Sequence, residues 1–158
     1  KAESSEINPE LNMYGLSTAI NLELQYLMSG FEFVFRKNFN RAVFTSYRFS
    51  GSYIIAPDSS TANNLVGFAN LQFDLAELYA RKIRKEIFEL KNLFSSDELI
   101  RDCFQKYTDE YVDVMGRLKK ELDLGQQVEA TEAKHREILN QLEVYAPYCY
   151  ACEKPKKP

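Results

Sequence analysis

The sequence is poor in the residues that end helices and turn the chain. Its 158 residues include six Gly, five Pro and no Trp. All-β and loop-rich proteins need many turn residues, so this scarcity favours long helices joined by few connections. The sequence also lacks any uncharged apolar run of about 18 residues, so we expect a soluble chain with no span of the bilayer.

The sequence also has a small net charge and few side chains that are suited to catalysis. A net charge of −3 is too small to attract a polyanion, so nucleic acid is not an expected partner. Any Ser-His-Asp or Cys-His arrangement would have to use His135, the single histidine, and no serine stands in a nucleophile-elbow context. Glycine-rich phosphate loops are absent as well. We therefore expect a protein that is not an enzyme.

What is present indicates one globular domain, because 45% of the residues are hydrophobic and 27% are charged. Apolar residues recur at near-helical spacing from Asn8-Pro9-Glu10, where Asn8 suits an N-cap and Pro9 the first helical position. Only Glu23 and Glu32 carry charge between residues 11 and 35. This first helix, expected to reach about Arg48, should therefore be the most enclosed one or face another subunit.

Residues 38–57 are also open to a second interpretation. Tyr47 and Phe49 before Ser50-Gly51, with Tyr53 and Ile55 after it, could form a short hairpin. We favour a helix to about Arg48, followed by an irregular connection that ends at Pro57.

Three further helices follow at clearer spacing. The second begins near Ser60 and continues to about Leu90, and the third begins after Ser95 or Ser96 and ends before Gly125. The fourth starts near Val128 and ends at Ala146-Pro147. Because the connections are short, the expected fold is all-α, an antiparallel up-and-down four-helix bundle with long helices. The expected parts are a flexible N-terminal arm (1–7), the bundle domain (8–146) and a C-terminal tail (147–158).

The sharpest local motif is Cys149-Tyr150-Ala151-Cys152. Two thiols at this spacing can share a metal, close a disulfide or attach haem. Zinc needs four ligands, so either Cys103 and His135 join the pair by folding of the tail onto the third helix, or two chains share one metal through their Cys149 and Cys152. We favour tail cysteines without a catalytic role, or a disulfide if the protein is exported. Residues 1–6 suit a fragment or a mature exported chain, so an exported or periplasmic location is favoured over the cytoplasm.

A helical bundle that ends in Cys-x-x-Cys resembles the cytochromes c′, which attach haem through such a motif near the C-terminus. In that family the next residue is the histidine that ligates the iron, and here it is Glu153, a hard oxygen donor. The resemblance covers the bundle pattern and a four-residue motif. It implies haem as an alternative cofactor without its axial ligand.

His135 and the basic residues of the second helix are the other polar candidates. With Glu132, His135 forms Glu-x-x-His, half of the signature of di-iron carboxylate bundles, and no second histidine completes it. We expect His135 to be a hydrogen-bonded residue on the apolar seam. The basic run Arg81, Lys82, Arg84 and Lys85 is interpreted as a solvated helix surface.

Aromatic residues are abundant, with ten Tyr and eleven Phe. The alternation of Phe31, Phe33 and Phe35 would display them on more than one side of a helix, so some must contact another element, a partner chain or a ligand. Ordinary packing is the first explanation and a dimer face the second, with Phe31, Phe33, Phe35 and Phe39 as the interface candidates. The leading hypothesis is a non-catalytic interaction or structural module that self-associates. The alternatives are a small-molecule, metal or haem binder and an exported sensory or accessory domain.

Overall fold

The computed structural model describes residues 17–19, 21–48, 50, 52–92, 94–153 and 155, with backbone alone for 17–19. Within these residues the chain is mostly helical. The α-helices are α1 (Gly30–Phe35), α2 (Ser59–Leu90), α3 (Glu98–Glu121) and α4 (Val128–Val144). The strands are β1 (Ser17–Ala19), β2 (Leu22–Tyr26), β3 (Val43–Tyr47) and β4 (Tyr53–Ile55), and short 3-10 helices are η2 (Asp123–Gly125) and η3 (Ala146–Tyr148).

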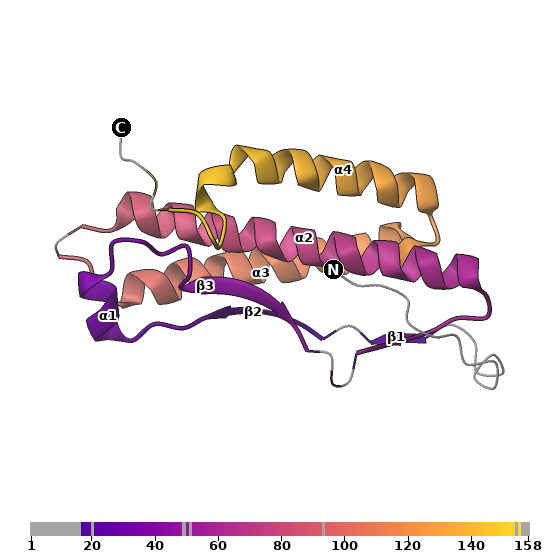
Figure 1. Cartoon of the computed structure of the whole chain (residues 1–158), viewed down its shortest axis with the longest axis horizontal. Coiled ribbons are helices and arrows are strands. Elements are labelled where there is room, and N and C mark those ends of the chain that lie inside the picture. The colour runs from indigo at the N-terminus through magenta and orange to yellow at the C-terminus, as the bar shows by residue number, and fades with distance from the viewer. Residues whose placement is uncertain are drawn as a thin grey trace.

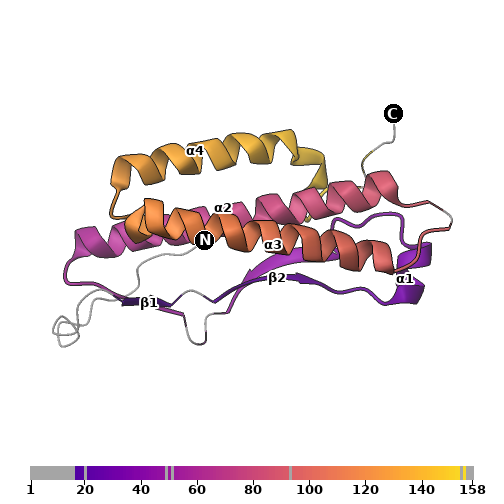
Figure 2. The same ribbon diagram turned by 180° about the vertical axis from the view of Figure 1, so that it is seen from behind.

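Helix α2 is the central element of the molecule. The Asp58 side chain caps its N-terminus by accepting a hydrogen bond from the Thr61 amide at 2.8 Å. Figures 1 and 2 show α4 on one side of α2 and the strands on the other, with α3 alongside and antiparallel to α2. Apolar residues therefore occur all around α2, as a helix enclosed by other elements requires. The most enclosed helix is α2, and the prediction that it would be the first helical segment is wrong.

The strands form two antiparallel pairs, together called the ribbon, that cover one face of α2. β2 pairs with β3 in the register Leu22↔Tyr47 to Tyr26↔Val43, and β1 pairs with β4. The predicted long first helix is wrong for residues 22–26 and 43–47, which form strands that pack on α2, and within the described part of this segment only α1 is an α-helix. The hairpin considered around Ser50-Gly51 is also wrong, since β3 and β4 each pair with an earlier strand. The expected arm (1–7) and the first turns of the predicted helix lie outside the described residues.

The three later helices are confirmed close to their expected ends. Gly125 ends the α3 region with a φ of +94°, a backbone conformation that favours glycine. The mainly helical class is thus confirmed. In the described part of the chain, however, three long helices and a β-ribbon take the place of four long helices.

The two larger of three apolar clusters make up most of the core in the described residues. One joins α2, α3 and α4 through residues that include Leu75, Met115 and Ile138. The other joins α2 and the start of α3 to the ribbon and α1 through Phe33, Val43, Ile87 and Ile100, among others. Each fully buried side chain of this size stabilises the fold by about 1.5 to 3 kcal/mol. None of the described helices is both long enough and apolar enough to cross a bilayer.

Candidate functional site

Helix α1 exposes most of its apolar side chains. A capping box begins it: the Ser29 hydroxyl accepts from the Glu32 amide, and the Glu32 carboxylate accepts from the Ser29 amide at 3.0 Å. These bonds to Ser29 lower the pKa of Glu32. Phe31 and Phe35, 77% and 67% exposed, have ring centroids 4.9 Å apart. One turn of helix thus presents two adjacent phenylalanine rings to solvent.

The connection between α2 and α3 runs beside α1. Lys91 donates from Nζ to the Val34 and Arg36 carbonyls at 3.1 and 3.3 Å, at the C-terminal end of α1. At the other end, a Cβ added to Gly30 would lie 3.5 Å from the Asp97 carboxyl group. The exposed apolar residues of the connection therefore lie at the same end of the molecule as α1.

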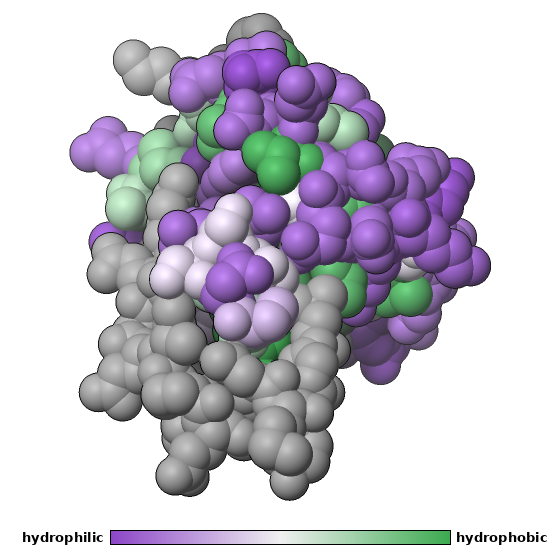
Figure 3. Space-filling model, turned by 90° about the vertical axis from the view of Figure 1, so that its right-hand side faces the viewer, coloured by the Kyte–Doolittle hydropathy of each residue, from purple (hydrophilic) through white to green (hydrophobic). Residues whose placement is uncertain are grey.

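We call this surface the apolar end. Its members are all exposed, and Phe94 is 96% exposed. They are Phe31, Val34, Phe35, Leu90 and Phe94. Figure 3 looks at the opposite end of the molecule, where hydrophilic residues cover most of the coloured surface and hydrophobic ones are scattered. Exposed apolar side chains that gather in one place indicate an interaction surface, whereas scattered ones do not.

The structure divides the four predicted interface phenylalanines into two pairs. Phe31 and Phe35 belong to the apolar end. Phe33 and Phe39 are buried, with ring centroids 5.6 Å apart, and the Lys91 ammonium lies 5.3 and 5.4 Å from those centroids. Two of the four predicted interface residues are therefore exposed and two belong to the core.

A second candidate region surrounds Arg84, which has no exposed surface. Its guanidinium donates to the Val43 carbonyl from Nε at 2.8 Å and from Nη2 at 2.6 Å. It also donates to both carboxylate oxygens of Glu77 and, from Nη1, to the Tyr148 carbonyl at 2.8 Å. Burial lowers the pKa of Arg84, and the hydrogen bonds and charge of Glu77 oppose this shift. The side chain thus joins β3, α2 and η3.

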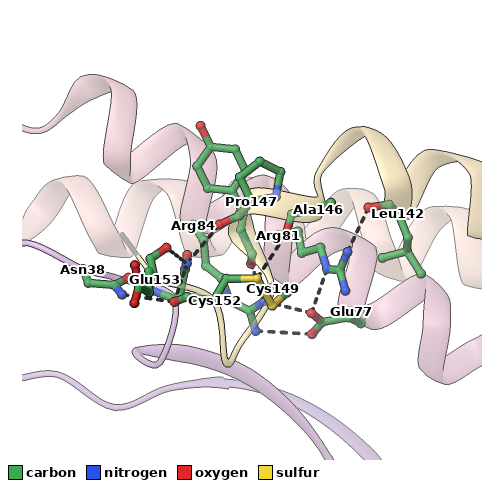
Figure 4. The surroundings of a disulfide bond; sticks show 12 residues. Asn38, Glu77, Arg81, Arg84, Leu142, Ala146, Pro147, Cys149, Cys152 and Glu153 are labelled. Atoms are coloured by element: carbon green, nitrogen blue, oxygen red, sulfur yellow. Dashed lines mark hydrogen bonds and ion pairs between the residues drawn. A yellow bond between two sulfur atoms is a disulfide. The ribbon is translucent and has the colours of Figure 1, made fainter. Parts of the chain in front are cut away.

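The segment that follows η3 folds back onto this region, as Figure 4 shows. Cys149 and Cys152 form a disulfide. Asn40, which is 1% exposed, donates from Nδ2 to the Pro147, Cys152 and Glu153 carbonyls at 3.1 to 3.3 Å. The disulfide considered from the sequence is present, and residues 147–153 are packed on the body of the protein instead of forming a free tail.

The residues considered as metal ligands do not converge. Cys149 and Cys152 are bonded to each other, and His135 precedes the end of α4 by about 14 Å of helix. Cys103 is buried in the core formed by α2, α3, α1 and the ribbon, where burial raises the pKa of its thiol to about 11. A search of the described residues finds no group of three or more His, Cys, Asp or Glu that could hold a metal ion.

His135 is a hydrogen-bonded residue on the seam of α4, as expected. Its Nε2 lies 2.8 Å from Oδ2 of Asp74, a buried residue of α2. Glu132, its partner in the half signature, is exposed. The pair between His135 and Asp74 therefore ties α4 to α2.

Sequence reasoning missed Arg84, Glu77 and Asn40. The interpretation of the basic run as a solvated surface is wrong for Arg84. A signal was available, because Ala80 and Phe88 stand four residues before and after Arg84, on the same face of α2. No local signal marks Asn40, whose acceptors are more than 100 residues away.

The apolar end and the region around Arg84 are the two candidate functional regions in the described part of the chain. Comparison with known proteins finds no matching family model, no similar curated protein and no similar solved structure.

Proposed function

We propose that this chain is a non-catalytic interaction module that self-associates through the apolar end. The observation that carries the proposal is the exposure of Phe31, Phe35 and Phe94 on one surface, beside Val34 and Leu90. Exposed aromatic rings that gather in this way are typical of protein interfaces, where Phe and Tyr are enriched.

The size of the apolar end is sufficient for a contact with a second copy. One phenylalanine ring can bury roughly 150 to 250 Å². The three exposed phenylalanines would thus bury on the order of 450 Å² in each copy. That is more than half of the roughly 800 Å² that each partner contributes to a standard interface. Val34 and Leu90 add to this area, so the apolar end is large enough for the centre of a dimer contact.

The charges beside the apolar end also suit a contact between identical surfaces. Glu32 lies next to Arg36, 3.5 Å away, and Lys37 follows on the chain, so both signs are present within a few residues. In a two-fold dimer the same patch meets itself in reverse, which brings acidic residues of one copy to basic residues of the other. A surface of one sign would repel its copy instead.

The disulfide adds a proposal about the compartment. Disulfides persist in oxidising compartments and are rare in the reducing cytosol. The Cys149–Cys152 bond therefore favours an exported or periplasmic place of work.

Sedimentation velocity of the wild type and of Phe31→Ser/Phe35→Ser tests the function. We expect a dimer at concentrations on the order of 10 to 100 μM and a monomer for the double variant. The matched control is Val144→Ser, because Val144 is as exposed as Phe31 but lies on α4. It should remain dimeric. A wild type that stays monomeric, or a double variant that still forms the dimer while keeping its circular dichroism, would refute the proposal.

A further inference from the structure

The loop of residues 147–153, here called the disulfide loop, is held by its backbone carbonyls. The Tyr148 carbonyl accepts from Arg84 at 2.8 Å, and the Pro147 carbonyl accepts from Asn40 at 3.1 Å. The Cys152 carbonyl accepts from both Asn38 and Asn40 at 3.2 Å. These three carbonyls of one short loop therefore accept from the same polar socket, which is formed by Arg84, Asn40 and Asn38.

The socket belongs to the body of the protein, and contacts outside the loop hold its Arg84 side chain. Arg84 and Asn40 are almost fully buried. Glu77 and the Val43 carbonyl hold the Arg84 guanidinium, and the Asn40 amide donates to the Asn38 side chain at 2.9 Å. Arg84 thus keeps partners in the body of the protein when the loop leaves, whereas the acceptors of the Asn40 side-chain amide all lie in the loop.

The two cysteines lie at the surface of this arrangement. Both are only half-buried, whereas the thiol of Cys103 is enclosed in the core. Figure 4 shows the sulfur–sulfur bond beside the socket, with the loop turning back through it. The disulfide closes a ring of four residues, a small constraint that changes the docking equilibrium of the loop by on the order of tenfold.

We propose that the Cys149–Cys152 disulfide is a redox latch whose reduction by a dithiol releases the disulfide loop from the socket. A thiolate of the dithiol attacks one cysteine sulfur, the S–S bond breaks, and the other cysteine leaves as a thiolate that takes up a proton. The second thiol of the dithiol then attacks the mixed disulfide and frees the first cysteine. The protein gains two electrons and two protons, and the dithiol becomes a disulfide.

The released state differs from the latched state in a limited region. Arg84 keeps Glu77 and the Val43 carbonyl, and water replaces the Tyr148 carbonyl. Arg81 still donates to the Leu142 carbonyl at 2.8 Å, so the end of α4 stays on α2. The change is therefore confined to the disulfide loop and the 38–43 segment that contacts it.

Hydrogen exchange followed by mass spectrometry tests this latch in the oxidised and dithiothreitol-reduced full chain. Reduction should speed exchange on the order of tenfold in residues 145–153 and 38–43, while α2 and α3 keep their protection. The variant Cys149→Ser/Cys152→Ser should match the reduced wild type. Asn40→Ala should loosen the same loop without any reduction.

Intact mass after alkylation supplies the control for the redox state, because the native oxidised chain should show no reactive thiol and the reduced chain two. Unchanged exchange in a chain that has gained both thiols would overturn the proposal. So would loss of protection throughout α2 and α3, since the disulfide would then be a staple of the whole fold. A bond that dithiothreitol reduces only after denaturation would overturn it as well.

Discussion

Arg84 combines full burial with a permanent charge. Moving a guanidinium out of water costs several kcal/mol, and only close pairing with good geometry offsets that cost. Here Glu77, the Val43 carbonyl and the Tyr148 carbonyl accept from every guanidinium nitrogen. The residue therefore contributes to stability by donating to the Val43 and Tyr148 carbonyls and by sharing Glu77 with Arg81.

Replacing Arg84 by Met should destabilise the fold by about 3 kcal/mol, because the largely buried Glu77 would keep only Arg81 as a cation and the Val43 and Tyr148 carbonyls would lose their donor. Urea unfolding followed by circular dichroism measures the change. The control is Lys85→Met, next along α2 and 41% exposed in its side chain, for which we expect a change within about 0.5 kcal/mol. An Arg84→Met protein as stable as the wild type would show that the hydrogen bonds of Arg84 make no net contribution to stability.

The 3-10 helix η2, which links α3 to α4, contains the residues with positive φ in the described part of the chain. Asp123 and Leu124 have φ values of 45° and 53°, in the left-handed region that non-glycine residues enter at a cost of about 1 kcal/mol or more. A Cβ on Gly125 would lie 2.5 Å from the Asn64 carbonyl oxygen and 2.9 Å from Cβ of Phe68. The turn thus reverses the chain in direct contact with α2.

Gly125→Ala should lower the free energy of unfolding by at least about 2 kcal/mol, because the new methyl group meets backbone and the φ is unfavourable. Thermal and urea unfolding measure the effect. Gly116→Ala is the matched control: Gly116 is exposed on α3, nothing lies within 4 Å of the added Cβ, and alanine there should raise stability by up to about 1 kcal/mol. Equal effects of the two substitutions would contradict this account.

The elements differ in how well the sequence predicts them. The spacing in α2, α3 and α4 repeats over many turns, and the caps and Gly125 mark their ends. From the start of β2 to the end of β3 the apolar residues are so frequent that they match both a helical and an alternating pattern. The choice is made by contacts with α2, which are distant in sequence.

The candidate sites follow the same division. The sequence predicts that the phenylalanines near residues 31–35 cannot all face one way, and it cannot tell which two face outward without α1 being known. Its motif leaves the disulfide open, because two thiols at this spacing can also share a metal or attach haem. Long-range hydrogen bonds between a side chain and backbone carbonyls leave no pattern in the sequence.

At the scale of the whole molecule, several tyrosines hold their protons more tightly in the fold. Burial raises the pKa of Tyr47, in the ribbon, to about 12, and Asp74 adds to this shift. Burial also raises the pKa of Tyr111, on α3, to about 12. In the unfolded chain a tyrosine loses its proton near pH 10. Above that pH the unfolded state therefore binds fewer protons than the folded state, and stability falls.

We expect the free energy of unfolding to decrease steadily from about pH 10 to pH 12. Urea unfolding at a series of pH values measures this free energy. The absorbance of tyrosinate should show that Tyr47 and Tyr111 ionise together with unfolding. Tyr47→Phe should flatten the slope, although it also removes the 2.6 Å hydrogen bond from the hydroxyl to the Ala69 carbonyl. A pH-independent stability across this range would contradict the tyrosine assignments.

The hydrogen-bond acceptors of Arg84 become available one after another during synthesis of the chain. Its acceptors Val43 and Tyr148 lie 41 residues before and 64 residues after it. While the ribosome is still adding α3 and α4, the guanidinium cannot reach one of its acceptors, and α2 lacks the helix that covers its other face. Until the disulfide loop has been synthesised, Arg84 therefore has Glu77 and the Val43 carbonyl as acceptors but lacks the Tyr148 carbonyl.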